Sequence, residues 1–256
     1  MRTVVKVGTS TLAYSTGHLN IRHMEKLCRV LSDLKNAGHE IILVSSGAVG
    51  MGMGRLSLSE RPVELVDKQA VAAVGQCELM YTYDKLFSEY NHTVGQILLT
   101  ADDVNDGEHR ANFIATVGRL LALRVLPVIN ENDTVSTEEF LIGDNDTLSA
   151  VVAANIGADL LIMLTDIDGL YTADPRTNTD AKLISRVDEI TDEIKSLAGG
   201  RGSRMGTGGM ITKIRAAEIA TAAGCDTLIA NGRDPGILYK IIEGEDVGTR
   251  FVAAGK

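Results

Sequence analysis

The sequence predicts an α/β protein whose mostly parallel sheet is covered by helices on both faces. Short apolar segments rich in Val, Ile and Leu alternate with longer segments of helical periodicity along nearly the whole chain, and this alternation is typical of such sheets. Hydrophobic residues make up 45% of the 256 residues, but aromatic residues make up only 4%. Aliphatic side chains must therefore fill the core, as buried parallel strands require. Because we find no internal repeat and no linker, we expect one domain over residues 1–256.

The first quarter of the chain is expected to contain two strands and a helix between them. A strand over Thr3–Val7 carries a lysine, Lys6, which is either an edge residue or a cation aimed into a cleft. Apolar residues at helical spacing predict a helix that Asn20 caps at its start and Gly38 ends. The second strand is expected at Glu40–Ser45.

A glycine-rich segment follows the second strand, with glycines at positions 47, 50, 52 and 54. We interpret this segment as a loop, because glycines let backbone N–H groups approach a ligand closely. The spacing matches neither the P-loop nor the dinucleotide-binding fingerprint. A mobile connection without a ligand is the alternative.

The periodicity of the remaining chain predicts the following elements. They are helices at Leu65–Phe87, Asn112–Leu123, Leu148 to about Gly157, Asp192–Leu197 and Pro235–Ile242, and strands at His92–Thr100, Val125–Ile129, Leu160–Leu164, Leu183–Val187, Thr227–Ala230 and Thr249–Val252.

The polar stretch Pro127–Asp146 is the most informative part of the chain. A strand ends in Asn130–Asp133, and a second polar group, Gly143–Asp146, stands at the start of a helix. Helix capping accounts for one such residue. Clustered carboxylates repel each other unless a metal, a lysine or a ligand ammonium group neutralises them. We therefore expect a binding site here, where open α/β sheets place their ligands.

A second glycine-rich segment, Gly199–Met210, holds six glycines in twelve residues and runs directly into a helix. Lys213 lies in the first turns of that helix. Glycines that lead into a helix start with a lysine nearby are suited to binding phosphate. A flexible linker is the alternative interpretation.

Composition and charge exclude several classes of protein. The net charge of −9 disfavours a broad surface for nucleic acid or for an anionic membrane. The three cysteines are far apart and show no metal-binding spacing, so they indicate a reducing compartment. The sequence shows no signal peptide and no apolar run of membrane length. We therefore expect a cytoplasmic protein, and we expect no protein-bound metal site.

The side chains that are present favour phosphoryl transfer. The five histidines show no ligand pattern, and no set of residues for covalent hydrolysis or oxidoreduction presents itself. Phosphoryl transfer needs alignment and neutralised charge rather than a protein nucleophile. Lysines and Mg²⁺ supply the positive charge, and a carboxylate can hold the lysines in place.

Several segments closely resemble the glutamate 5-kinase group of the amino acid kinase family. They are VVKVGTSTL (4–12), SSGAVGMG (45–52), AAVGQ (72–76), PVINENDTV (127–135), GDND-LSA (143–150), LTD-DGLYTADPR (164–176) and GTGGM-TK (206–213), where each hyphen marks one skipped position. The resemblance covers essentially the whole chain in the family's order. It implies a three-layer αβα sandwich and the ATP-dependent phosphorylation of the γ-carboxyl group of L-glutamate, the first step of proline biosynthesis.

The resemblance also implies roles for individual residues. Lys6 and Lys213 would stabilise the transferring phosphoryl group, and Asp146 would orient both lysines. The residues implied for the acceptor are Ser46, Gly47, Ala48, Asp133 and Asn145. The residues implied for the nucleotide are Lys6, Thr165, Asp166, Thr207, Gly208, Gly209, Met210 and Lys213. Residues up to about 150 would bind the acceptor, and residues 151–256 the nucleotide.

The chemistry of the acceptor argues for free glutamate. A free α-ammonium group pairs with the carboxylate of Asp133, whereas N-acetylglutamate would leave that carboxylate buried and unpaired. The alternatives are another kinase of the same fold that acts on acetylglutamate, aspartate, carbamate or a nucleoside monophosphate, and a non-catalytic amino-acid sensor. A sensor would be expected to have lost one of the lysines or Asp146, and all three are present.

The resemblance implies a homo-oligomer, a dimer or a tetramer, and feedback inhibition by proline. Many members of the family carry a C-terminal PUA domain, and we expect none here because the chain stops at Lys256. That difference affects the expected oligomer and its regulation rather than the chemistry. The implied partners are therefore small molecules: L-glutamate, ATP with Mg²⁺, and proline.

Overall fold

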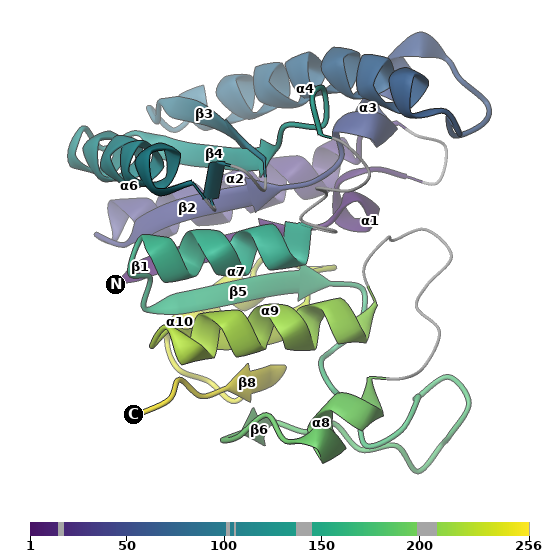
Figure 1. The fold of residues 1–256 in the computed structure, drawn as a ribbon, viewed down its shortest axis with the longest axis vertical. Coiled ribbons are helices and arrows are strands. Elements are labelled where there is room, and N and C mark those ends of the chain that lie inside the picture. The colour runs from purple at the N-terminus through teal and green to yellow at the C-terminus, as the bar shows by residue number, and fades with distance from the viewer. Residues whose placement is uncertain (15–17, 101–102, 105, 137–144, 199–208, 256) are drawn as a thin grey trace.

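A computed structural model describes residues 1–14, 18–100, 103–104, 106–136, 145–198 and 209–255. Within these residues, the strands form a single sheet in the order β3-β4-β2-β1-β5-β7-β8-β6 (Figure 1). Neighbouring strands are parallel throughout, except that β7 and β8 are antiparallel. The predicted α/β class with a mostly parallel sheet is confirmed.

The strands are β1 (Arg2–Val7), β2 (Glu40–Ser45), β3 (Val94–Leu99), β4 (Leu126–Glu131), β5 (Leu160–Thr165), β6 (Arg186–Val187), β7 (Asp226–Asn231) and β8 (Thr249–Phe251). The helices are α1 (Thr9–Leu12), α2 (Ile21–Asn36), α3 (Ala48–Leu56), α4 (Leu65–Ser88), α6 (Gly107–Ala122), α7 (Asn145–Asn155), α8 (Asp192–Leu197), α9 (Met210–Ala222) and α10 (Ile237–Ile242).

Two hydrophobic cores lie on opposite faces of the sheet, because successive strand residues point to opposite sides. Val4 belongs to the core that α6, α7 and α9 cover, and its neighbour Val5 belongs to the core that α2, α4 and α10 cover. Figure 1 shows α7 and α9 side by side in front of the sheet and α2 behind it. The expected three-layer αβα sandwich is therefore present.

The order of the strands places β1 at the point where the chain changes direction across the sheet. β2 and β4 lie on one side of β1, and β5 and β7 lie on the other. All five strands are parallel, so their carboxyl ends meet at one edge. Open α/β sheets bind ligands in the crevice at such a switch point. Lys6, the penultimate residue of β1, stands at this crevice.

The segment after β2 is a helix rather than the glycine-rich loop that the sequence suggested. Gly50, Gly52 and Gly54 all lie within α3, and α3 packs closely on α4. A Cβ atom on Gly52 would lie 1.9 Å from the carbonyl oxygen of Val71, and one on Gly75 would lie 1.7 Å from that of Ala48. These two glycines therefore permit close packing of two helices. Among the glycines at positions 47, 50, 52 and 54, Gly47 alone, with φ of 109°, needs glycine for a left-handed backbone.

Replacement of Gly75 by alanine tests this close packing. We expect Gly75→Ala to lower Tm by about 5 °C or more, since the added methyl group forces α4 away from Ala48. Gly118→Ala, in α6, is the matched control, because a Cβ atom at this position would have no neighbouring residue's atom within 4 Å. It should raise Tm by about 2 °C. Equal thermal unfolding of both variants would contradict the packing role.

Other differences concern the ends of elements. The expected strand over Leu183–Val187 is reduced to β6, because only Arg186 and Val187 pair with β8. The helix expected to begin at Asn112 begins at Gly107, where the side chain of Asp106 accepts hydrogen bonds from two backbone N–H groups. Among the described helices, none is long and apolar enough to span a membrane.

Candidate active site

Two buried lysines meet on one buried carboxylate at the centre of the sheet edge. Nζ of Lys6 lies 2.6 Å from Oδ1 of Asp146, and Nζ of Lys213 lies 3.0 Å from Oδ2. The side chain of Asp146 is 1% exposed, and those of the lysines are 10% and 8% exposed. The three residues come from β1, α7 and α9, so the fold joins the two ends of the sequence at this point. Lys6 is therefore central and not an edge residue.

Asp146 is held as a carboxylate. Burial alone would raise the pKa of Asp146, but the charges and hydrogen bonds of Lys6 and Lys213 outweigh this effect and lower the pKa to about 2. With two cations on one anion, the group carries a net positive charge in a buried place. It is therefore suited to an additional anion.

A threonine that the sequence analysis did not single out completes this group. The hydroxyl group of Thr212 lies 2.9 Å from Oδ2 of Asp146 and 2.8 Å from the carbonyl oxygen of Gly209. Thr212 precedes Lys213 in the first turn of α9, which packs beside α7. The carboxylate of Asp146, on α7, is thus held by two residues of α9 and by Lys6 of β1.

On the β2 and β4 side, two of the residues implied for the acceptor, Asn145 and Ser46, are joined by a hydrogen bond. Nδ2 of Asn145 lies 2.7 Å from Oγ of Ser46 and 3.3 Å from the carbonyl oxygen of Ser45. Ser46 begins the connection to Gly47 and Ala48 at the start of α3. Asn145 directly precedes Asp146, so the acceptor residues adjoin the lysine pair in the chain as well as in space.

Asp133 lies in the turn after β4 and is partly buried. Burial, together with the negative charge of Glu131, raises the pKa of Asp133 to about 6, although Arg61 opposes the shift. A carboxyl group held at this pKa is stabilised in its charged form by a cation. The structure does not bring Asp133 into direct contact with Asn145 or Ser46.

Two helices begin at this edge of the sheet without side-chain caps. The N-cap residues are Gly47 for α3 and Gly209 for α9, and neither helix start receives a hydrogen bond from a capping side chain. The first N–H groups of a helix have no partner within the helix, and the helix dipole favours negative charge there. The start of α3 follows β2 and the start of α9 carries Lys213, so the two starts are suited to two separate anions.

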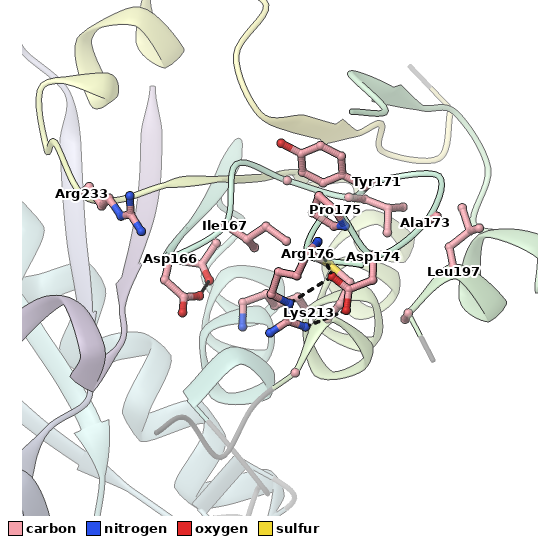
Figure 2. A pocket seen from close by; sticks show the side chains of 16 residues that line it. Asp166, Ile167, Tyr171, Ala173, Asp174, Pro175, Arg176, Leu197, Lys213 and Arg233 are labelled. Carbon is pink, nitrogen blue, oxygen red and sulfur yellow. Dashed lines mark hydrogen bonds and ion pairs between the residues drawn. The ribbon is translucent and has the colours of Figure 1, made fainter. Parts of the chain in front are cut away.

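On the β5 and β7 side, a pocket of about 430 Å³ opens beside Lys213 (Figure 2). Five of the residues implied for the nucleotide line it: Thr165, Asp166, Gly209, Met210 and Lys213. Asp166 follows the end of β5, and its carboxylate accepts a hydrogen bond of 3.2 Å from the hydroxyl group of Thr165. Thr207 and Gly208, which were also implied for the nucleotide, lie outside the described residues.

Several residues of this pocket were missed in the sequence. Arg176 is paired with Asp174 at 3.0 Å, and Tyr171 and Arg233 also line the pocket. Tyr171 donates a hydrogen bond of 3.0 Å to Asp168. The segment GLYTADPR contained most of these residues, but its polar side chains follow no periodicity that would have indicated their direction.

No group of three or more His, Cys, Asp or Glu side chains that would hold a metal ion occurs in the described parts of the chain. Asp146 is engaged by both lysines. Asp166, on the pocket, is a carboxylate available for an ion that is bound mainly by phosphate oxygens and water, as Mg²⁺ usually is.

Two buried ammonium groups converge on one carboxylate beside a pocket, and this arrangement, in an open α/β fold, is that of a phosphotransferase. The chain belongs to the amino acid kinase family, whose pattern matches residues 1–231.

Among its relatives are several glutamate 5-kinases. That of Clostridium perfringens is 52% identical over 256 residues, with 98% of this chain and 95% of the relative covered. That of Clostridium tetani is 55% identical over 250 residues, with 98% and 94% covered. One from Listeria monocytogenes is 51% identical over 256 residues, with 98% and 93% covered.

Two solved structures share the fold. The isopentenyl phosphate kinase of T. acidophilum has a TM-score of 0.64 at 17% identity and covers 98% of this chain and 100% of its own. The UMP kinase from Bacillus anthracis has a TM-score of 0.68 at 17% identity and covers 99% and 96%. At this identity the likeness concerns the fold alone.

Proposed function

We propose that this protein is a glutamate 5-kinase that transfers the γ-phosphoryl group of ATP to the γ-carboxylate of L-glutamate. The product is L-glutamyl 5-phosphate, which is formed in the first step of proline biosynthesis. The observation that carries this proposal is the buried group of Lys6, Asp146 and Lys213 between the acceptor side and the nucleotide side of one sheet edge. The relatives named glutamate 5-kinase match nearly the whole chain, and their name indicates glutamate as the acceptor.

The reaction requires two anions to meet in line. A γ-carboxylate oxygen attacks the γ-phosphorus, an O–P bond forms, and the bond from that phosphorus to the β-phosphate oxygen breaks to release ADP. Lys6 and Lys213 neutralise the charge on the transferring group, and Asp146 holds both ammonium groups at one place. Alignment and fixed charge are what this reaction needs from a protein.

The remaining residues divide between the two substrates in this proposal. Ser46, Gly47 and Ala48 bind the acceptor at the start of α3, while Asp133 and Asn145 bind its amino acid part. Thr165 and Asp166 lie by the nucleotide, and the segment Thr207–Met210 with Lys213 surrounds its phosphates. The acceptor part extends to about residue 150, and the nucleotide part covers residues 151–256.

Mg²⁺ enters this scheme with ATP, as part of the substrate. It offsets the charge of the β- and γ-phosphates when bound. Asp166 is placed to contact it directly or through water, because this side chain lines the pocket beside Lys213. Asp146 does not serve this purpose, since each of its oxygens already faces a lysine.

Asp133 recognises the α-ammonium group of glutamate. Replacement by alanine should raise KM for glutamate about 10- to 100-fold, the effect of one hydrogen bond to a charged group, and should leave KM for ATP nearly unchanged. Steady-state kinetics with each substrate varied in turn measures the difference. An equal rise in both KM values would remove Asp133 from the acceptor site.

The raised pKa of Asp133 makes acceptor binding depend on pH. Below the pKa of about 6 the carboxyl group is neutral and no longer attracts an ammonium group, so kcat/KM for glutamate should fall as the pH drops through 6. A folded pKa above the unfolded one also means that ionisation costs stability as pH rises. In Asp133→Asn, the fall of kcat/KM for glutamate below pH 6 should therefore disappear. The Tm of the free variant at pH 8 should be higher than that of the unmodified protein. A profile that is unchanged in Asp133→Asn would contradict this assignment.

The decisive experiment for the function is an acceptor screen. The protein is incubated with ATP, Mg²⁺ and hydroxylamine, which traps acyl phosphates as hydroxamates. L-Glutamate should yield hydroxamate, whereas N-acetylglutamate, aspartate and carbamate should not. Product from another acceptor would identify a different kinase of the family, and glutamate binding without any product would identify a sensor.

We further propose a cytoplasmic homo-oligomer, a dimer or a tetramer, that proline inhibits. Large apolar side chains are exposed around the α3–α4 connection, where Val63 is 80% and Val66 70% exposed, with Leu56 and Leu58 beside them. An exposed apolar patch of this kind favours association of copies. Light scattering with and without proline, alongside the activity assay, tests both parts.

A further inference from the structure

Three side-chain amides form a continuous chain from α4 to the acceptor site. Nδ2 of Asn130 donates to Oε1 of Gln76 at 2.9 Å. Oδ1 of Asn130 accepts from Nδ2 of Asn145 at 2.9 Å and from the backbone N–H of Glu131 at 2.9 Å. Each amide therefore sets the direction of the next, because an amide nitrogen only donates and an amide oxygen only accepts.

This chain fixes which end of the Asn145 amide remains for a ligand. Its nitrogen faces Asn130, Ser46 and the carbonyl oxygen of Ser45. Its oxygen is buried and has no hydrogen-bond partner within the part of the chain that the structure describes. A buried acceptor without a partner is costly and is satisfied when a donor binds.

We propose that Gln76 is a positioning residue that makes Asn145 selective for a ligand with an ammonium group. Gln76 holds Asn130, Asn130 holds the nitrogen of Asn145, and the oxygen of Asn145 then accepts a hydrogen bond from the α-ammonium group of the acceptor. This inference rests on the proposed function, since it takes L-glutamate as the acceptor. It assigns to Gln76 an effect on recognition without contact with the substrate.

The packing of α4 explains why Gln76 can act in this way. Gly75, the preceding residue, lies against the carbonyl oxygen of Ala48 at the start of α3, which fixes this turn of α4 beside the acceptor site. Two turns earlier on the same face of α4, Nε2 of Gln69 donates a hydrogen bond of 3.1 Å to the carbonyl oxygen of Ser136. The helix thus holds both ends of the segment Asn130–Ser136, which contains Asp133.

The expected effect follows from the loss of the fixed orientation of the Asn130 amide group. Without an acceptor at position 76, Asn130 is held in place only by the N–H of Glu131 and by Asn145. The side-chain amides of Asn130 and Asn145 can then rotate by half a turn more easily. The nitrogen of Asn145 is then fixed mainly by Ser46 and by the carbonyl oxygen of Ser45 at 3.3 Å, so Asn145 presents its oxygen to the ligand less often. A hydrogen bond to a charged group contributes about 10- to 100-fold in affinity.

The test compares two variants with two ligands that differ only in the ammonium group. Gln76→Met retains the approximate volume and removes the acceptor, whereas Gln76→Glu retains a carboxyl oxygen that can accept from Asn130. Each is assayed with L-glutamate and with glutarate, which is glutamate without its α-amino group. Where glutarate is not phosphorylated, its Ki against glutamate gives the same comparison.

We expect Gln76→Met to lower kcat/KM for L-glutamate about 10-fold or more, with glutarate and KM for ATP changed less than about twofold. Gln76→Glu should stay within about threefold of the original protein, because the hydrogen bond to Asn130 is retained. Thr82→Val is the matched control in α4, because the hydroxyl group of Thr82 donates to the carbonyl oxygen of Glu78 within its own helix. It should change the constants of glutamate and glutarate by the same factor.

Two results would overturn the inference. Equal losses for glutamate and glutarate in Gln76→Met would show that Gln76 only supports the fold, and a loss in Gln76→Glu as large as in Gln76→Met would exclude the hydrogen bond to Asn130 as its means of action. Failure of the unmodified protein to phosphorylate glutamate would instead refute the proposed function. The two failures are therefore distinguishable.

Discussion

Replacement of Lys213 by methionine should lower kcat about 10³-fold while the protein remains folded. Such losses are typical when one cation or fixed donor is removed from a transferring phosphoryl group. Nζ of Lys213 is buried and lies 3.0 Å from Asp146, on the side of the nucleotide pocket. Methionine nearly matches the shape of the lysine stem, so packing against α7 should survive. The effect should appear in kcat under saturating glutamate and ATP.

Lys195→Met is the control for this experiment. Lys195 is also helical and also paired with a carboxylate, that of Glu218 at 2.7 Å, but its side chain is 42% exposed and lies outside the pocket. Its loss should leave kcat unchanged, since exposed ion pairs contribute little. Near-normal turnover of Lys213→Met would remove Lys213 from the chemistry.

Replacement of Asp146 by asparagine should have the second large effect, on both stability and rate. The change leaves two buried ammonium groups without their shared counter-ion, and breaking such a buried group costs several kcal/mol. We expect Tm of the free protein to fall by about 5–10 °C, and kcat to fall about 10²-fold or more because the lysines are no longer held together.

ATP should partly reverse the loss of stability in this variant. Its phosphates supply the negative charge that Asp146 provided, so the increase in Tm caused by ATP should be larger in Asp146→Asn than in the unmodified protein. Thermal unfolding with and without ATP measures this difference. An unchanged Tm of the free variant, or an ATP effect smaller than that of the unmodified protein, would contradict the role of Asp146 as the counter-ion.

Much of the fold was predictable because its signals are local. Alternating apolar segments indicated the parallel sheet, and Asn20 does cap α2, where its side chain accepts from the N–H of His23. The glycines of α3 suggested a loop, and there is a physical reason why they form a helix instead. Helix propensity counts glycine as a helix breaker, but Gly52 and Gly75 lack a Cβ atom where two helices touch, and that packing depends on residues far away in the sequence.

The candidate site was predictable only in part. Lys6, Asp146 and Lys213 could be named because each stands at a strand end or a helix start, and the structure joins them. Gln76 and Thr212 stand in quoted segments but received no individual role, since each acts through a hydrogen bond to a residue more than 50 positions away. Arg176 and Tyr171 were quoted within a motif, yet the pocket that they line exists only in three dimensions.

The most direct test is a structure of the complex with L-glutamate and a non-hydrolysable ATP analogue. A γ-carboxylate oxygen of glutamate should face the terminal phosphate of the analogue, with the ammonium groups of Lys6 and Lys213 on either side and Asp146 beneath both. A complex in which the phosphates occupy the pocket but glutamate binds away from Lys6, or in which the two ligands do not face each other, would contradict the account.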